Sequence, residues 1–234
     1  DEGQTDFSVI PEEAHDLNIN LVPQTEDQKW KPALPSLIHF RYTDSEFSSW
    51  TASERTINED RDAVPSSYCP REAQKLDELT KSEFDTYIDS LTANGLTYHD
   101  GGMIWGARFI SPNGIFAAEN TSAPIGEAIA RHIVFMSDGL LVTRQNLYGR
   151  YGIEFWDRRV AADGAANQQR NNHAARFQAA CRAARNENIS VWGVAVGTAL
   201  SQNLIDCATP GRAYEASNSQ ALSDAFKEIA EKIA

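Results

Sequence analysis

The sequence predicts a mixed α/β fold in which helices alternate with strands of a parallel sheet. Two short runs, residues 133–136 and 189–197, are apolar and β-branched, which is typical of strands buried on both faces. Helices that alternate with such strands define a doubly wound, Rossmann-like sheet. The first run ends in Ser137-Asp138-Gly139, so a carboxylate stands where open α/β sheets bind ligands. A role for Asp138 as the cap of the next turn or helix is an equal alternative.

Composition and charge limit the organisation of the chain. It has 234 residues, of which 41% are apolar, enough for a substantial core. No run reaches the length of a membrane span, so membrane attachment is expected only through a segment outside this chain. The whole net charge of −12 falls on residues 1–94, whereas charges balance over 95–234. We therefore expect an acidic accessory or insertion region over 1–94, an α/β core over 95–234, and no nucleic-acid partner, since phosphate binding needs a basic face.

The elements are expected in an order set by apolar spacing and breaker residues. Residues 36–42 are expected to form a strand, and a helix is expected to begin at Thr80 or Ser82 and to end near Leu91. After Gly95 the expected order is a helix over 100–110, a strand over 133–136, a loop through 148–151, a helix over 172–186, a strand over 189–197, a helix over 200–207, a strand over 212–216 and a helix over 219–233.

Three stretches carry a resemblance to a known family. They are GLTYHDGGMIWGARFISPNGIF (95–116), RHIVFMSDG (131–139) and the ending that starts with NLIDCATPGRAY at Asn203. Together they resemble the von Willebrand factor A-like portion of TadG-like proteins of tight-adherence (Flp) pilus systems. The resemblance implies a Rossmann-like sheet that holds a divalent cation at one edge, through an Asp-x-Ser-x-Ser loop, a threonine and an aspartate. Thr97 and Asp138 match the threonine and the aspartate.

The chain departs from the family pattern in one large respect. It has no Asp-x-Ser-x-Ser motif, and its acidic start offers no first strand for the sheet. Two explanations stay open: the chain is the C-terminal part of a longer protein, or it is a complete but degenerate member. Magnesium requires near-octahedral oxygen coordination, and Thr97 and Asp138 supply two ligands at most. We therefore expect a partial site that binds Mg²⁺ or Mn²⁺ weakly or not at all.

Three cysteines are present, Cys69, Cys181 and Cys207. The last two match a paired pattern of the family, whose members are exported, so the resemblance implies a disulfide between them. Two buried free thiols are the alternative, because a cysteine packs well as a small apolar residue. Cys69 is then left without an assigned partner.

Catalytic motifs are missing from the sequence. Ser111 or Ser137 could act as a nucleophile with one of the histidines, but no Gly-x-Ser-x-Gly elbow occurs. No His-x-x-x-His spacing for zinc occurs either. Structural roles are therefore preferred for His99, His132 and His173.

The aromatic residues Tyr148, Tyr151 and Trp156 lie in a loop-rich, arginine-containing segment. Such residues are enriched at protein interfaces, so we expect a partner-contact patch there. The preferred interpretation is a non-enzymatic adhesion or scaffolding module of a pilus-assembly or cell-surface protein. It would act in the periplasm or outside the cell on protein partners of the envelope. The alternatives are an exported hydrolase with an Asp/His pair and a purely structural filament or envelope subunit.

Overall fold

The computed structural model describes residues 14–29, 71–93, 96–121, 123, 126–143, 148–154, 158–161 and 166–233. The chain divides into two compact units. Unit 1 comprises residues 1–3, 31–96 and 143–170, and unit 2 comprises residues 4–30, 97–142 and 171–234. The strand expected over 36–42, Cys69 and Trp156 lie outside the described residues.

Unit 2 is built on a parallel sheet with the strand order β1-β4-β5. β1 spans Arg131–Ser137, β4 spans Ile189–Val196 and β5 spans Ala213–Ala216. β4 is the central strand and pairs in parallel with both of its neighbours. The mixed α/β class with parallel strands is therefore confirmed, with three strands in this sheet among the described residues.

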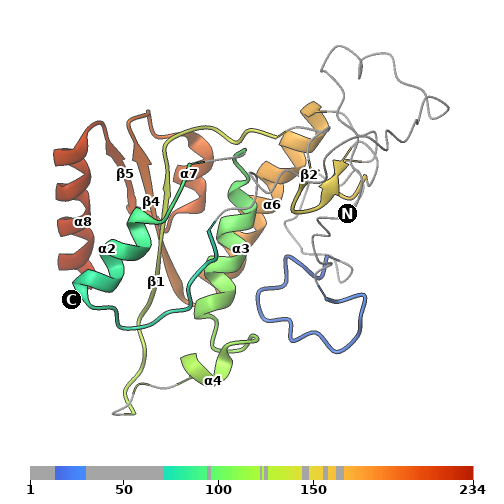
Figure 1. Ribbon diagram of the computed structural model, residues 1–234, viewed down its shortest axis with the longest axis horizontal. Coiled ribbons are helices and arrows are strands. Elements are labelled where there is room, and N and C mark those ends of the chain that lie inside the picture. The colour runs from blue at the N-terminus through green and yellow to red at the C-terminus, as the bar shows by residue number, and fades with distance from the viewer. Residues whose placement is uncertain are drawn as a thin grey trace. The chain divides into compact units, whose positions relative to one another are not determined.

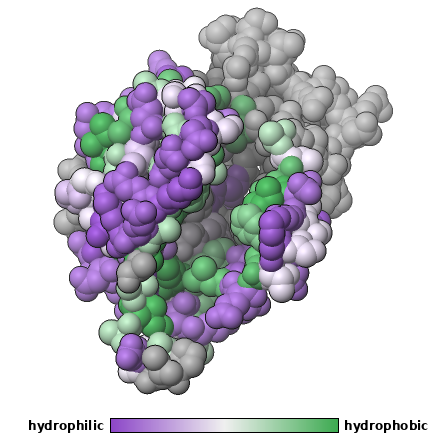
Figure 2. Space-filling model, turned by 90° about the vertical axis from the view of Figure 1, so that its left-hand side faces the viewer, coloured by the Kyte–Doolittle hydropathy of each residue, from purple (hydrophilic) through white to green (hydrophobic). Residues whose placement is uncertain are grey.

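Helices cover the sheet from both sides (Figure 1). α3 (His99–Ile110), α6 (Ala166–Asn186) and α7 (Gln202–Cys207) contribute to the core on one face. α8 (Ser219–Ile233) packs on the other face. α8 lies at the left of Figure 1 and so faces the viewer in Figure 2, where its outer side is mainly hydrophilic. This amphipathic pattern matches the stripe of apolar residues that predicts the helix.

The larger core cluster fills the space between the sheet and α3, α6 and α7. At the contact with α7, Gly193 of β4 allows a close approach of the helix. A Cβ at this position would lie 3.0 Å from Cγ of Leu204 and 3.2 Å from its carbonyl oxygen. The fully buried side chains of this cluster include Leu17, Met103, Ile104, Ala107, Phe177, Ala180, Ala184, Ile189 and Val191. Burial of each large apolar side chain contributes roughly 1.5–3 kcal/mol.

The opposite face of the sheet is organised around Trp192, which is completely buried. Its indole Nε1 donates a hydrogen bond to Nδ1 of His132 over 3.1 Å. The guanidinium of Arg212 lies 4.3 Å from the centre of the indole ring. Val194, Ala216 and Ile229 complete this cluster. The polar end of the indole is thus satisfied inside an otherwise apolar contact.

One expectation about β1 is wrong. Its apolar run predicts burial on both faces, but Val134 is 36% exposed and Met136 is 52% exposed. β1 is an edge strand of the described sheet, and α8 packs over β4 and β5 instead. The same expectation is confirmed for β4, where Val191, Trp192 and Val194 are all completely buried.

The described elements of unit 1 include α2 (Lys81–Asp89), which begins where its capping signal predicts. The hydroxyl of Thr80 accepts from the amide of Glu83, and the Glu83 carboxylate accepts from the amide of Thr80. This reciprocal capping satisfies two amides that the helix start would otherwise leave unpaired.

The loop expected over residues 148–151 is instead part of a short hairpin. β2 (Tyr148–Gly149) pairs antiparallel with β3 (Gly152–Ile153). Gly152 has a φ of 88°, which a side chain would disfavour, so the turn depends on this glycine. A further short helix, α4 (Ala117–Asn120), was not expected. None of the described helices is long and apolar enough to cross a membrane.

Candidate functional site

The two residues expected to bind a cation lie near the carboxyl end of β1. Thr97 and Val142 exchange two backbone hydrogen bonds of 3.1 Å each in an isolated antiparallel bridge. Asp138 follows β1 directly and its side chain is exposed, whereas Thr97 is half-buried. The bridge brings the segment before α3 to the loop after β1. We call this region, formed by Thr97, His99 and residues 137–139, the carboxyl edge.

His99, the first residue of α3, contacts the end of β1 directly. Its Nε2 lies 3.1 Å from Oγ of Ser137. The Ser137 hydroxyl also lies 3.0 Å from the carbonyl oxygen of Gly139 and accepts from the Gly139 amide over 3.3 Å. Burial lowers the pKa of His99, and the nearby Asp100 carboxylate opposes this shift. The imidazole is therefore neutral at pH 7 and orders the start of the loop through Ser137.

A small pocket of about 20 Å³ adjoins this contact. It is lined by His99, Ser137 and Gly139, together with Thr198 after β4 and Ser201 before α7. A cavity of this size has room for about one water molecule. Leu140, Ala195, Ala199 and Leu204 complete the lining, so the carboxyl ends of two neighbouring parallel strands meet at a small pocket of mixed polar and apolar character. Thr198 and Ser201 were not singled out in the sequence, although Gly197 at the end of β4 marks the same edge.

The carboxyl edge fits a divalent cation only in part. The Asp138 carboxylate and the Thr97 hydroxyl are hard oxygen ligands of the type that Mg²⁺ prefers. No group of three or more His, Cys, Asp or Glu side chains that could hold a metal occurs in the described part of the chain. Two protein oxygens leave most of an octahedral shell to water. Among the described residues, Thr97 and Asp138 therefore supply part of the coordination shell of a divalent cation.

An Asp/His pair does form, at a place that no substrate can reach. Nδ1 of His173 in α6 lies 2.8 Å from Oδ2 of Asp100 in α3, and both side chains are completely buried. Nε of Arg176 lies 3.6 Å from the same oxygen, and Arg176 also pairs with Asp16. The Tyr98 ring packs edge-on against His173. This buried cluster holds α3, α6 and the residue 14–20 segment together.

The disulfide implied by the family resemblance is confirmed. Cys181 in α6 is bonded to Cys207, the last residue of α7, with the two Cα atoms 5.1 Å apart. Both residues are completely buried. Arg185 donates to the carbonyl oxygen of Cys207 and adds a second link between the helices. The bridge thus fixes α7, whose first turn borders the pocket at the carboxyl edge.

The expected partner-contact patch belongs to unit 1 and is described only in part. Tyr148 lies in β2, and Tyr151 is half-buried in the hairpin turn. The guanidinium of Arg150 lies 5.2 Å from the centre of the Tyr151 ring, a favourable cation–π contact. The patch stays a prediction.

Comparison with known proteins leaves the family open. No protein-family model, curated protein or solved structure matches the chain.

Proposed function

We propose that the chain is a non-enzymatic adhesion or scaffolding module of a TadG-like pilus-assembly or cell-surface protein, with a von Willebrand factor A-like fold. The observation that carries this proposal is the carboxyl edge. There an exposed carboxylate and several hydroxyls gather at the strand ends where open α/β sheets bind ligands. The adjoining pocket has room for about one water, a size that suits a surface partner better than an enclosed substrate.

The proposed setting is the periplasm or the cell surface. The Cys181–Cys207 disulfide supports this, because disulfides persist in oxidising compartments. The partner is a protein of the envelope, and the net charge of −12 disfavours nucleic acid. Any attachment to a membrane is assigned to a segment outside this chain.

Replacing Thr97 and Asp138 together with alanine is expected to weaken partner binding by about tenfold or more, because truncation of interface hot spots costs roughly 2 kcal/mol or more. The measurement is a quantitative pull-down with the immobilised chain, from the envelope fraction of the source cells in the presence of Mg²⁺. Asp224→Ala, which removes one carboxylate from the exposed side of α8, is the matched control. Equal capture by the double variant would contradict a binding role for the carboxyl edge and favour a purely structural subunit.

A hydrolase is the second candidate, and the contact between Ser137 and His99 is the observation that favours it. Ser137 is also engaged with Gly139, and the pocket beside it is too small for a substrate in this conformation. Turnover in a screen of generic ester, glycoside and phosphate substrates, lost in Ser137→Ala, would favour the hydrolase over the binding module.

A further inference from the structure

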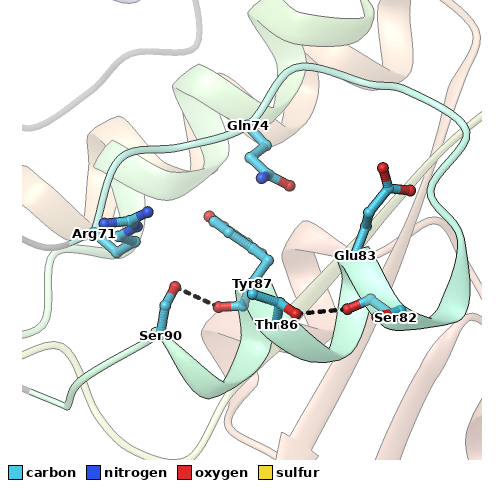
Figure 3. Close-up of a pocket in the computed structure, with 7 residues that line it drawn as sticks. All are labelled: Arg71, Gln74, Ser82, Glu83, Thr86, Tyr87 and Ser90. Atoms are coloured by element: carbon cyan, nitrogen blue, oxygen red, sulfur yellow. Dashed lines mark hydrogen bonds between the residues drawn. The ribbon is translucent and has the colours of Figure 1, made fainter.

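A larger pocket, in unit 1, has a chemistry that the proposed function does not use. It has a volume of about 290 Å³ and lies between residues 71–74 and α2 (Figure 3). This volume is close to the lower end, roughly 300 Å³, of typical small-molecule sites. The lining side chains all carry hydrogen-bonding groups: Arg71, Gln74, Ser82, Glu83, Thr86, Tyr87 and Ser90.

Two local features hold the walls of this pocket together. The capping pair of Thr80 and Glu83 fixes the start of α2. The hydroxyl of Tyr87 donates to the carbonyl oxygen of Glu72 over 3.0 Å, which ties the 71–74 segment to the helix. The pocket is thus built by contacts within residues 71–90.

The hydroxyls of the pocket are available mainly as acceptors. Ser90 donates to the carbonyl oxygen of Tyr87 over 2.6 Å, and Thr86 donates to the carbonyl oxygen of Ser82 over 2.7 Å. A hydroxyl that has donated its only proton keeps lone pairs for a ligand. Hydrogen bonds from Thr80 lower the pKa of the Glu83 carboxyl, so this group is ionised. The side of the pocket formed by Thr86 and Glu83 therefore suits a ligand group rich in N–H donors.

Arg71 supplies the opposite chemistry. Its guanidinium carries five N–H donors and makes no hydrogen bond or ion pair within the described part of the chain. Arg71 and Ser90 lie on one side of the pocket and Glu83 on the other, with Tyr87 between them (Figure 3). A guanidinium binds a carboxylate with two parallel hydrogen bonds. The acidic surroundings, which include Glu72, Asp85 and Asp89, disfavour a ligand that carries only negative charge.

We propose that this pocket binds a short zwitterionic ligand whose ammonium and carboxylate groups are separated, as in a di- or tripeptide. The carboxylate contacts Arg71, and the ammonium contacts Glu83 and the hydroxyl of Thr86. The Tyr87 ring packs against the backbone between the two charged groups.

The test is a titration of the full chain with triglycine, followed by NMR. Triglycine is expected to shift the amide signals of residues 71–74 and 82–90 saturably in the millimolar range. Arg71→Gln is expected to weaken binding about tenfold or more, the usual size for loss of a hydrogen bond to a charged group. Triglycinamide, which lacks the carboxylate, should lose as much. Glu83→Gln removes the negative charge that contacts the ammonium, and N-acetyl-triglycine lacks the ammonium, so each change should weaken binding to the same extent. Glutamine at position 83 still caps the helix, so α2 is preserved in this variant.

Lys75→Gln is the matched control, because it removes one positive charge from the same segment without lining the pocket. This variant should bind triglycine as the unmodified chain does. The proposal is overturned if millimolar triglycine produces no saturable shift in these residues. It is equally overturned if Arg71→Gln or triglycinamide binds with unchanged affinity while the spectrum of α2 is preserved.

Discussion

Replacing Arg176 with methionine is expected to lower the free energy of unfolding by about 3–5 kcal/mol, because breaking a buried charge pair leaves the partner charge uncompensated. The Arg176 side chain is 1% exposed and lies against Asp16 and Asp100. Burial lowers its pKa to about 9, so the guanidinium is still charged at neutral pH. Methionine fills a similar volume but leaves the buried Asp100 carboxylate without this cation. The measurement is urea unfolding at pH 7.

Arg170→Met provides the control for this substitution. Arg170 lies in the first part of the same helix and is exposed, so the change is expected to cost no more than about 0.5 kcal/mol. A loss below about 1 kcal/mol for Arg176→Met, within the range of surface ion pairs, would show that the buried cluster does not stabilise the fold.

Reduction of the Cys181–Cys207 disulfide is the second large effect. The bridge joins residues 26 positions apart, and loop entropy gives a loss of about 3 kcal/mol when a loop of this size is opened. Denaturation with and without reductant measures the effect. Because both cysteines are completely buried, the reductant must be present while the chain unfolds.

The variant with alanine at both positions 181 and 207 is expected to be destabilised to at least the same extent and to be insensitive to reductant. Two findings together would contradict the assignment. They are equal stability of the chains with and without reductant, and alkylation of both cysteines in the denatured chain without reductant.

The fold elements that the sequence predicted well are those with a local periodic signal. α3, α8 and β4 begin and end close to their expected positions, since apolar spacing and flanking breakers are local properties. The burial of β1 could not be predicted in the same way. The apolar run from Ile133 to Met136 is compatible with a strand that is buried on both faces. Whether a helix packs on each face depends on tertiary contacts, and Val134 and Met136 remain exposed.

The residue 14–20 segment shows a second limit. Leu17 and Ile19 stand between polar residues, yet both enter the core of unit 2. Arg108 of α3 donates to the backbone carbonyl oxygens of His15 and Asp16, which pins the segment to the helix. These contacts join residues about ninety positions apart, and isolated polar residues carry no periodic signal for such pairing.

At the carboxyl edge, the sequence points to individual residues, and the structure adds how these residues are arranged. Asp138 was identified from the end of a strand and Thr97 from the family resemblance, and both lie near the carboxyl end of β1. The contact between His99 and Ser137 that orders this edge joins two elements, so it became visible only in the fold.

The most direct test of the account asks whether the oxygens of Thr97 and Asp138 share one edge of the sheet. Mn²⁺ broadens NMR signals close to its binding site, so a titration of the full chain reports the location and the affinity together. We expect Mn²⁺ in the millimolar range to broaden the signals of Thr97 and residues 137–139 together, and Asp138→Asn to remove this effect. Broadening of Asp138 without Thr97 would contradict the shared edge, and the absence of broadening at both residues would contradict Mn²⁺ binding there. Sub-millimolar affinity for Mn²⁺ would contradict the expectation that Thr97 and Asp138 supply two ligands at most.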